Sequence, residues 1–257
     1  MTSSAENSTA QPWVSGPLVS WPLVSCIMVT RDRPEFVLQS IQYFFRQDYP
    51  NRELIIVDDG SCDLASVVTG IEHVRYHRAP GGMSIGEKRN LACDLAQGEY
   101  IAQWDDDDWY SPRRLSIQLA PLLAGPADIS AFTAGVFFEL PRWRFWRCSP
   151  KVHRCMFVGN VHCGTLVFRR KLYDQGLRYR SLSLAEDAHL LCDAKRGGSR
   201  VCRLSGDDSF VYLRHANNAW QFTCGEHIDA RGWSEVPIPE VLAADCKFYE
   251  ERALSLK

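Results

Sequence analysis

The segment SIGEKRNLACDLAQGEYIAQWDDDD, residues 84–108, predicts a helix, a strand and an acidic turn in direct succession. Ser84 and Glu87 have the spacing of a capping box, and apolar residues then recur on one helical face until Gly98. The run EYIAQW that follows favours a strand. Asp105–Asp108 come directly after it, so a group of carboxylates is expected where this strand ends.

The sequence on either side continues the alternation of strands and helices. LVSCIMVT (23–30) and ELIIVDDGS (53–61) contain continuous apolar runs, which are typical of strands buried on both faces. Asp32 and Glu35 have the spacing of a second capping box, with Pro34 in the first turn, and predict a helix between these strands. Weaker patterns predict strands around 74–76, 164–170 and 209–214, and helices from Ser111 to 125, from Ser183 to Lys195 and over 239–254.

This order of elements predicts an α/β fold. Its mixed central sheet should be mostly parallel, with helices on both faces. Residues 1–22 are rich in Ser, Thr, Pro and Gly, and we expect them to form a flexible tail. Residues 23–257 are expected to form a single domain, which is long enough to bury a sizeable core.

Composition excludes several classes of protein. The 257 residues carry 29 Lys and Arg against 31 Asp and Glu, and a net charge of −2 does not support bulk nucleic-acid binding or a polybasic membrane surface. No apolar run approaches the roughly 18 residues of a membrane span. The N-terminal stretch also lacks the basic region and apolar core of a secretion signal. We therefore expect a cytoplasmic protein, in solution or held at the inner face of the membrane.

Polar clusters follow three of the predicted strands, at Thr30–Asp32, Asp58-Asp59 and Asp105–Asp108. The carboxyl ends of parallel strands share one edge of a sheet, so these clusters should meet at one crevice. Two unit charges 4 Å apart repel by roughly 4 kcal/mol at an effective dielectric of 20, and a divalent cation would relieve that repulsion. If the acidic stretch is extended, Asp105 and Asp107 point one way and the other two aspartates the opposite way. The alternative is a solvated acidic turn before the next helix.

Other motifs are less specific. GGMSIGEKRN (81–90) is not a phosphate-binding loop of the Walker type, but Lys88 and Arg89 lie where a helix start could meet a phosphate. Glu186-Asp187 open a predicted helix, where acidic residues also favour the helix dipole. LRHANNAW (213–220) combines polar planar groups with Trp, which suits a sugar or phosphate. The cysteines and histidines at 148–163 do not have the spacing of a common zinc site.

In this order, VSCIMVTRDRP, ELIIVDDGS, GEKRNLACDLAQGEYIAQWDDDDWYSP and LAEDAHLL resemble the family-2 glycosyltransferases. The resemblance covers about Val24 to Leu191 and extends more loosely to Trp220. It implies the GT-A fold, with a Rossmann-like nucleotide-sugar half at about 23–125 fused to an acceptor half at 126–257. It also implies transfer of a sugar from a nucleotide sugar with inversion, using a divalent cation, Mg²⁺ or Mn²⁺.

The resemblance also implies roles for individual residues. The donor side consists of residues that border or bind the base, the ribose and the diphosphate, namely Thr30, Arg31, Asp59, Asp105, Asp106 and Arg89. Asp59 would hydrogen-bond the base and Arg89 would face the diphosphate. Asp105 and Asp107 form the D-x-D motif, with Asp107 the direct metal ligand and Asp105 and His215 further metal contacts. Asp187 matches the general base.

The sequence departs from the family pattern in two places. Arg31-Asp32-Arg33 stands where many members carry an aromatic residue that stacks on the base. The sequence therefore does not fix the identity of the base, and uracil is the expected one. The Q-x-x-R-W signature of processive members is absent, which favours a single addition to a carbohydrate, lipid-linked or other hydroxyl acceptor. Two alternatives remain: a nucleotide-sugar pyrophosphorylase, which would need a Gly-rich signature after the first strand, and a non-catalytic sugar-binding protein that keeps the fold.

The region around Trp143 and Trp146, with arginines at 142, 144 and 147, has three interpretations. Aromatic faces stack on sugars and arginines bind anions, so it could be an acceptor platform or lid. It could equally be a partner surface, or an arginine-rich loop that covers the core.

Overall fold

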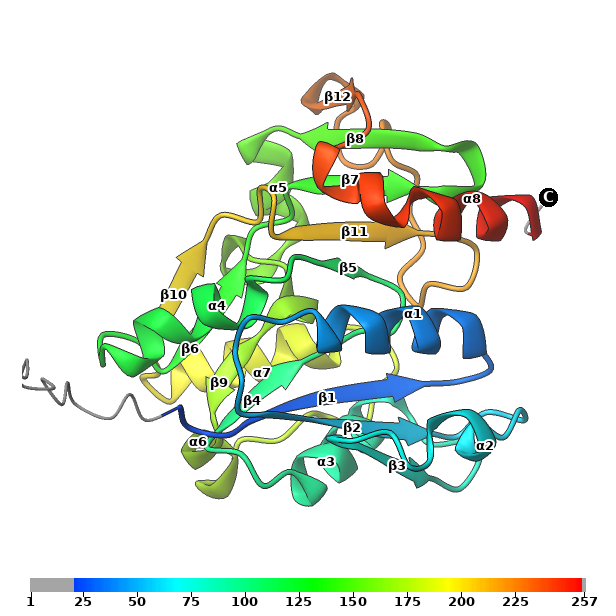
Figure 1. The fold of residues 1–257 in the computed structure, drawn as a ribbon. Helices are drawn as coiled ribbons and strands as arrows, with labels where there is room; N and C mark the ends of the chain where they lie inside the picture. Colours follow the sequence, from blue (N-terminus) through cyan, green and yellow to red (C-terminus); the bar gives the residue numbers. More distant parts are fainter. Residues whose placement is uncertain (1–20, 256–257) are drawn as a thin grey trace, which may run out of the picture.

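The computed structural model describes residues 21–255 and is built around a seven-stranded sheet (Figure 1). The strand order is β10-β6-β9-β4-β1-β2-β3, and only β9 runs antiparallel to its neighbours. The strands are β1 (Val24–Thr30), β2 (Arg52–Asp58), β3 (Val74–Arg78), β4 (Tyr100–Gln103), β6 (Ile129–Phe132), β9 (Val167–Arg169) and β10 (Val201–Leu204). The mostly parallel mixed sheet is confirmed. The tail expected at 1–22 lies outside the described residues, except for Trp21 and Pro22.

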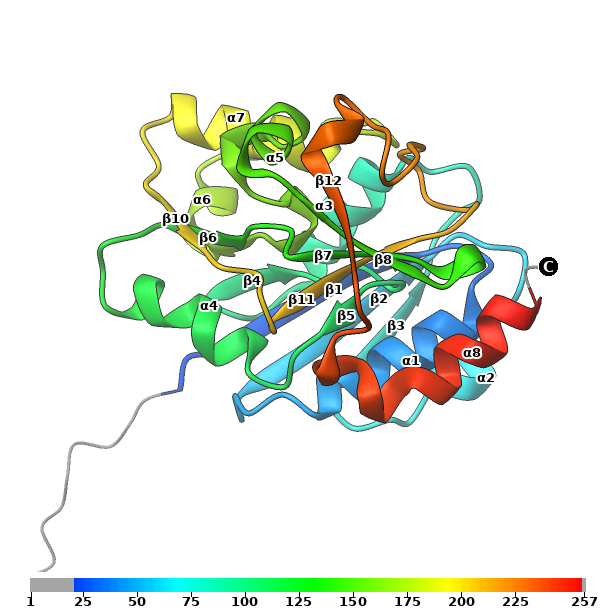
Figure 2. The ribbon, with the colours of Figure 1, turned by 90° about the horizontal axis from the view of Figure 1, so that it is seen from above.

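Helices cover both faces of this sheet, as expected. Cys26 and Met28 of β1 face the core under α1 (Pro34–Phe45) and α4 (Arg114–Leu123), whereas Ile27 and Val29 face α3 (Ile85–Leu95) and α7 (Glu186–Arg196). The alternation along β1 thus supplies two hydrophobic cores from one strand. Figure 2 shows α8 (Cys246–Ser255) beside α1, where the hydroxyls of Tyr43 and Tyr249 are 2.8 Å apart.

A second sheet of five strands lies above α1 in Figure 1 and has the order β12-β8-β7-β11-β5. Its strands are β5 (Trp109–Tyr110), β7 (Val136–Glu139), β8 (Arg144–Cys148), β11 (Phe210–Arg214) and β12 (Trp233–Val236). The shorter helices are α2 (Ala65–Val68), α5 (Pro150–Met156), α6 (Arg170–Asp174), η1 (Leu140–Arg142), η2 (Val158–Asn160), η3 (Cys163–Thr165), η4 (Ala230–Gly232) and η5 (Glu240–Asp245). Since β6, β9 and β10 complete the main sheet, residues after 126 share the core of the preceding half.

Helix starts were predicted with mixed success. The capping box of Ser84 and Glu87 is present at α3, but α1 has no side-chain cap, because Oδ1 of Asp32 accepts from the backbone N–H groups of Ser61 and Cys62 instead. The cap expected from Ser183 at α7 is also wrong. The Ser183 hydroxyl accepts a hydrogen bond from Ile85 N of α3 at 3.3 Å. The residue before α7 is Ala185, which has a left-handed backbone with φ 61°.

Two other helix expectations need correction. The helix expected from Ser111 begins at Arg114, and the Ser111 hydroxyl accepts from Arg113 N outside it. The terminal helix expected over 239–254 is a 3₁₀ helix followed by α8. Within residues 21–255, no helix combines the length and the apolar character that crossing a bilayer requires.

The Trp143 and Trp146 region covers the core. Trp143 packs edge-on against Phe138 with ring centres 5.1 Å apart. The Arg144 guanidinium lies 4.4 Å from the centre of the Trp146 ring and pairs with Glu235 across β8 and β12. The region is not a loop, because it consists of η1 and of β8 in the second sheet, and the acceptor-platform and partner-surface interpretations stay predictions.

Gly86 fixes the segment that leads into α7. A Cβ at Gly86 would lie 1.8 Å from the carbonyl oxygen of Arg180, and Gly86 N donates to Leu182 O at 2.9 Å. We expect Gly86→Ala to lower the free energy of unfolding by about 3 kcal/mol, because backbone on both sides must shift. Gly197→Ala is the matched control, since its Cβ would meet nothing closer than 3.4 Å. Urea denaturation measures both, and equal stabilities would contradict the prediction.

Candidate active site

A pocket of about 400 Å³ opens beyond the carboxyl ends of β1 and β4. One wall carries charge and consists of Arg33, Arg89, Asp105, Asp106, Asp107, Asp108, Glu186 and Asp187. The opposite wall is largely apolar and aromatic and includes Met156, Phe157, Val158, His162, Tyr212 and Trp220. Carboxylates that are distant in the sequence therefore meet in one cavity. Of the three polar clusters expected to share one crevice, only Asp105–Asp108 contributes carboxylates to the lining, and the distant partners, Glu186 and Asp187, come from α7.

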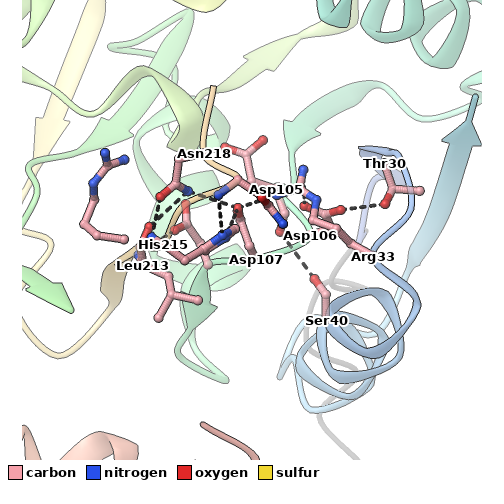
Figure 3. Close-up of polar contacts among 12 residues, drawn as sticks. Thr30, Arg33, Ser40, Asp105, Asp106, Asp107, Leu213, His215 and Asn218 are labelled. Carbon is pink, nitrogen blue, oxygen red and sulfur yellow. Dashed lines mark hydrogen bonds and ion pairs between the residues drawn. The ribbon is translucent and has the colours of Figure 1, made fainter. Parts of the chain in front are cut away.

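Arg33 is the cation at the centre of the acidic run (Figure 3). It contacts Oδ2 of Asp107 at 2.6 Å and Oδ1 of Asp106 at 3.0 Å. Thr30 donates to Oδ2 of Asp106 at 2.6 Å, so the end of β1 is tied to the turn after β4. Burial raises the pKa of Asp106 to about 6, although Arg33 opposes the rise. Asp106 is thus held between two side chains of the β1–α1 segment.

Asp107 faces the C-terminal part of the chain. Its Oδ2 lies 3.0 Å from Nε2 of His215 and 3.2 Å from Nδ2 of Asn218 (Figure 3). Burial works against the charge, but Arg33 and His215 outweigh it and hold the pKa of Asp107 well below its usual range. Asp107 is therefore ionised at neutral pH and sits beside an imidazole.

The alternation expected along the acidic run is wrong. Residues 106–108 form a bend, not an extended strand, and Asp106 and Asp107 both reach Arg33. Asp105 turns instead toward α3, where its Oδ1 accepts from Arg89 at 2.9 Å. Asp108 is buried and accepts from Leu213 N at 2.9 Å, which joins the turn to β11.

Glu186 and Asp187, at the start of α7, have different surroundings. Glu186 is buried and accepts from Nε of Arg89 at 3.0 Å, so Arg89 bridges Glu186 and Asp105. The Asp187 side chain is only partly buried, lines the pocket and has Ala188 N as a neighbour at 2.6 Å. Burial raises the pKa of Asp187 to about 7, repulsion from Glu186 adds to the rise, and Arg89 opposes it.

The residues expected at the base lie outside the pocket lining. Asp59 is buried, and its oxygens are taken by Lys88 Nζ at 2.6 Å and by Arg31 at 2.8 Å. Lys88 also donates to the carbonyl of Thr30 at 3.0 Å. The half-exposed Arg31 is the part of this group that a ligand could reach first. The base contacts of Thr30, Arg31 and Asp59 stay predictions, and Asp59 can meet a base only if Arg31 gives way.

Several residues of the site had no sequence signal strong enough to find them. Arg33 lies in the departing Arg31-Asp32-Arg33 segment, but its partners Asp106 and Asp107 are more than 70 positions away. Met156 and Phe157 line the pocket without any motif that marks them, whereas Trp220 belongs to the LRHANNAW segment that the sequence singles out.

A divalent cation fits the chemistry of Asp107 and His215. Across residues 21–255, no three or more His, Cys, Asp or Glu side chains are grouped as metal ligands. A cation at this place would therefore have one carboxylate and one imidazole as protein ligands, and phosphate oxygens of a ligand would have to complete the sphere. Such a cation would have to separate Arg33 from Asp107.

In the cysteine and histidine cluster at 148–163, both ring nitrogens of His153 already have hydrogen-bond partners, Ala134 N and Asn160, so His153 has no nitrogen left for a metal ion.

Comparison with known proteins identifies the family. The sequence model of glycosyl transferase family 2 matches residues 25–178, and the chain belongs to this family. WcaA of Escherichia coli (strain K12), provisionally named a colanic acid biosynthesis glycosyl transferase, is 42% identical over 101 residues, which are 37% of this chain and 36% of WcaA. The chain thus matches about a third of that relative's length.

Solved structures share the fold. Staphylococcus aureus TarS 1–349 in complex with UDP-GlcNAc has a TM-score of 0.61 at 18% identity, over 79% of this chain and 62% of TarS 1–349. The mannosyltransferase PcManGT from Pyrobaculum calidifontis, in complex with GDP-Man and Mn²⁺, has a TM-score of 0.56 at 18% identity, over 79% of this chain and 60% of that chain. The GT-A fold that the resemblance implied is confirmed.

Proposed function

We propose that this chain transfers a sugar from a nucleotide sugar, with UDP as the expected carrier, to a hydroxyl acceptor with inversion and with a divalent cation. One observation carries the proposal: the Asp107–His215 pair, Arg89 and Asp187 line or adjoin one pocket. The TarS complex with UDP-GlcNAc and the PcManGT complex with GDP-Man and Mn²⁺ support a nucleotide-sugar donor and a cation.

The residues divide the reaction between the two ends of the donor. The acceptor oxygen attacks the anomeric carbon, the bond from that carbon to the diphosphate oxygen breaks, and Asp187 takes the acceptor proton. Arg89 carries positive charge at any working pH and would stabilise the leaving diphosphate from α3. The cation, when bound at Asp107 and His215, would neutralise the same developing charge. Asp105 and Glu186 fix the Arg89 guanidinium by hydrogen bonds on two sides.

Release of nucleoside diphosphate tests the proposal. UDP-glucose, UDP-galactose, UDP-N-acetylglucosamine and GDP-mannose are first screened by thermal shift, with and without Mn²⁺, because a bound ligand stabilises by RT ln(1 + [L]/Kd). The donor that stabilises most should then release free diphosphate with an acceptor mixture. Formation of nucleotide sugar from sugar phosphate and UTP would support a pyrophosphorylase instead. Binding without any release would support a non-catalytic protein.

The processive alternative has no support in the sequence, so we propose a single addition. A test with a saccharide or lipid-linked acceptor should give one product larger by one sugar residue, and a ladder of products would contradict it. The acceptor class and the location of the protein at the inner membrane face stay predictions.

The pH dependence of the rate should follow Asp187. A general base works only when deprotonated, and the pKa of Asp187 is raised to about 7. We therefore expect kcat/KM for the acceptor to rise with pH up to about 7 and to level off above it, with a loss of about tenfold per unit on the acid side. A rate that is flat from pH 5 to pH 8 would contradict this assignment.

A further inference from the structure

The pocket lining contains a guanidinium that the reaction described above does not use. Arg33 lines the pocket, and 22% of its side-chain surface is exposed. Arg89, the other arginine of the lining, has only 5% of its side chain exposed and is fixed between Asp105 and Glu186. Arg33 is therefore the arginine that a molecule in the pocket can reach more easily.

The two terminal nitrogens of Arg33 contact different carboxylates (Figure 3). Nη2 lies 3.0 Å from Oδ1 of Asp106, and Nη1 lies 2.6 Å from Oδ2 of Asp107. Asp106 is also held from a second side, because its Oδ2 accepts from the Thr30 hydroxyl at 2.6 Å. The contact with Asp107 can therefore break while the contact with Asp106 keeps the guanidinium in place.

Asp107 is the carboxylate for which a divalent cation and Arg33 compete. Its Oδ2 faces Nη1 of Arg33 and Nε2 of His215, so a cation that binds there frees Nη1. The ligands of a small octahedral cation lie about 2.1 Å from it, which places two of them roughly 3 to 4 Å apart. A diphosphate oxygen that shares the cation with Asp107 would thus lie close to the freed nitrogen.

The charge of the pocket also favours a second cationic group for the donor. The lining carries the acidic side chains of residues 105–108 and 186–187 against the two arginines. A nucleoside diphosphate adds further negative charge, and like charges a few ångströms apart repel each other. A guanidinium forms charge-assisted hydrogen bonds with phosphate oxygens, so Nη1 of Arg33 has a suitable new partner there.

We propose that Arg33 binds the diphosphate of the donor by an exchange of partners. The cation replaces Nη1 of Arg33 at Asp107, and Nη1 turns to a phosphate oxygen while Nη2 stays on Asp106. The inference rests on the proposed function and adds to it the residue that makes the cation and the nucleotide bind cooperatively. The competing interpretation is that Arg33 only blocks the cation and never meets the diphosphate.

Arg33→Gln tests the exchange, because the amide removes the positive charge and keeps a polar side chain. Two constants are measured. The first is the Kd of Mn²⁺ for the protein alone, from the electron paramagnetic resonance signal of free Mn²⁺. The second is the Kd of UDP at saturating Mn²⁺, from calorimetry corrected for the association of Mn²⁺ with UDP in buffer. Arg147→Gln is the matched control, since Arg147 pairs with Asp207 outside the pocket lining.

We expect the two constants to change in opposite directions. Mn²⁺ should bind the Arg33→Gln variant about five- to tenfold more tightly than the wild type, because Asp107 is no longer occupied by a guanidinium. UDP should bind about tenfold more weakly in the presence of Mn²⁺, because a charge-assisted hydrogen bond to the diphosphate is lost. The Arg147→Gln control should leave both constants within about twofold of the wild type.

Each other result contradicts the exchange. A Kd of UDP that does not rise means that Arg33 only blocks the cation, and a Kd of Mn²⁺ that does not fall means that Arg33 does not compete at Asp107. If circular dichroism shows that the Gln variant does not fold, Arg33→Lys decides, because one ammonium cannot bridge Asp106 and a phosphate as a guanidinium does. The Kd of UDP with Mn²⁺ should then rise about threefold or more, and an unchanged value would overturn the proposal. A wild-type chain that binds no UDP with Mn²⁺ would refute the proposed function itself.

Discussion

Asp187→Asn should lower kcat by about 10²-fold or more while donor binding stays close to that of the wild type, because the amide cannot take the acceptor proton. The exchange keeps the shape of the side chain and the oxygen that faces Ala188 N. It also removes a charge that burial and Glu186 disfavour, since the raised pKa means that the ionised form costs stability. The variant should therefore unfold at the same or a slightly higher denaturant concentration than the wild type.

Asp193→Asn is the matched control for Asp187→Asn. Asp193 lies on the same helix, more than one turn beyond the last pocket-lining residue, Ala188, and pairs at the surface with Arg180 and Arg196. This variant should keep the wild-type kcat. Steady-state kinetics on both, with the Kd of the donor from calorimetry, distinguishes a lost base from a disturbed helix. Wild-type turnover in Asp187→Asn would remove Asp187 from the role of base.

The main sheet could be predicted because its signals are local. The apolar runs of β1 and β2 and the capping box at Ser84 each lie within a few residues, and parallel strands then require their polar ends to share one edge. That requirement predicts that the polar ends of β1, β2 and β4 lie close together, and the contacts of Thr30 with Asp106 and of Lys88 with Thr30 and Asp59 join them. Asp187 begins a helix, so its place in the same pocket as Asp107 does not follow from the strands. The second sheet was missed because β5 has only two residues, and β11 pairs in parallel with β7 across more than 70 positions.

Partners from distant parts of the chain explain the remaining errors. Asp32 has the spacing of a helix cap, but the loop after β2 offers its backbone N–H groups at 2.5 and 3.0 Å, and these contacts prevail. The need of four successive aspartates for a divalent cation was likewise inferred without Arg33, which pairs with Asp106 and Asp107. The contacts of Asp32 with the loop after β2, and of Arg33 with the acidic run, cannot be predicted from a single sequence, because they depend on which loops lie next to each other in the fold.

Asp107→Ala is expected to remove most of the effect of Mn²⁺ on donor binding. We propose Asp107 as the direct ligand because it is the carboxylate that faces the imidazole of His215. We expect the Kd of UDP in the presence of Mn²⁺ to rise by about 100-fold, a loss in the upper part of the range for substitutions in metal sites. With EDTA in place of Mn²⁺, wild type and variant should bind UDP about equally. Calorimetry measures all four values.

The Asp207→Ala variant controls for the loss of a carboxylate alone, since Asp207 is exposed and pairs with Arg147 away from the pocket. Arg33 adds a further expectation, because in the wild type its guanidinium must leave Asp107 before a cation can bind there. Mn²⁺ should therefore bind weakly until a diphosphate is present to accept the Arg33 guanidinium. If Asp107→Ala keeps the full Mn²⁺ dependence, the cation binds elsewhere, and the Asp107–His215 pair serves only to position the turn after β4.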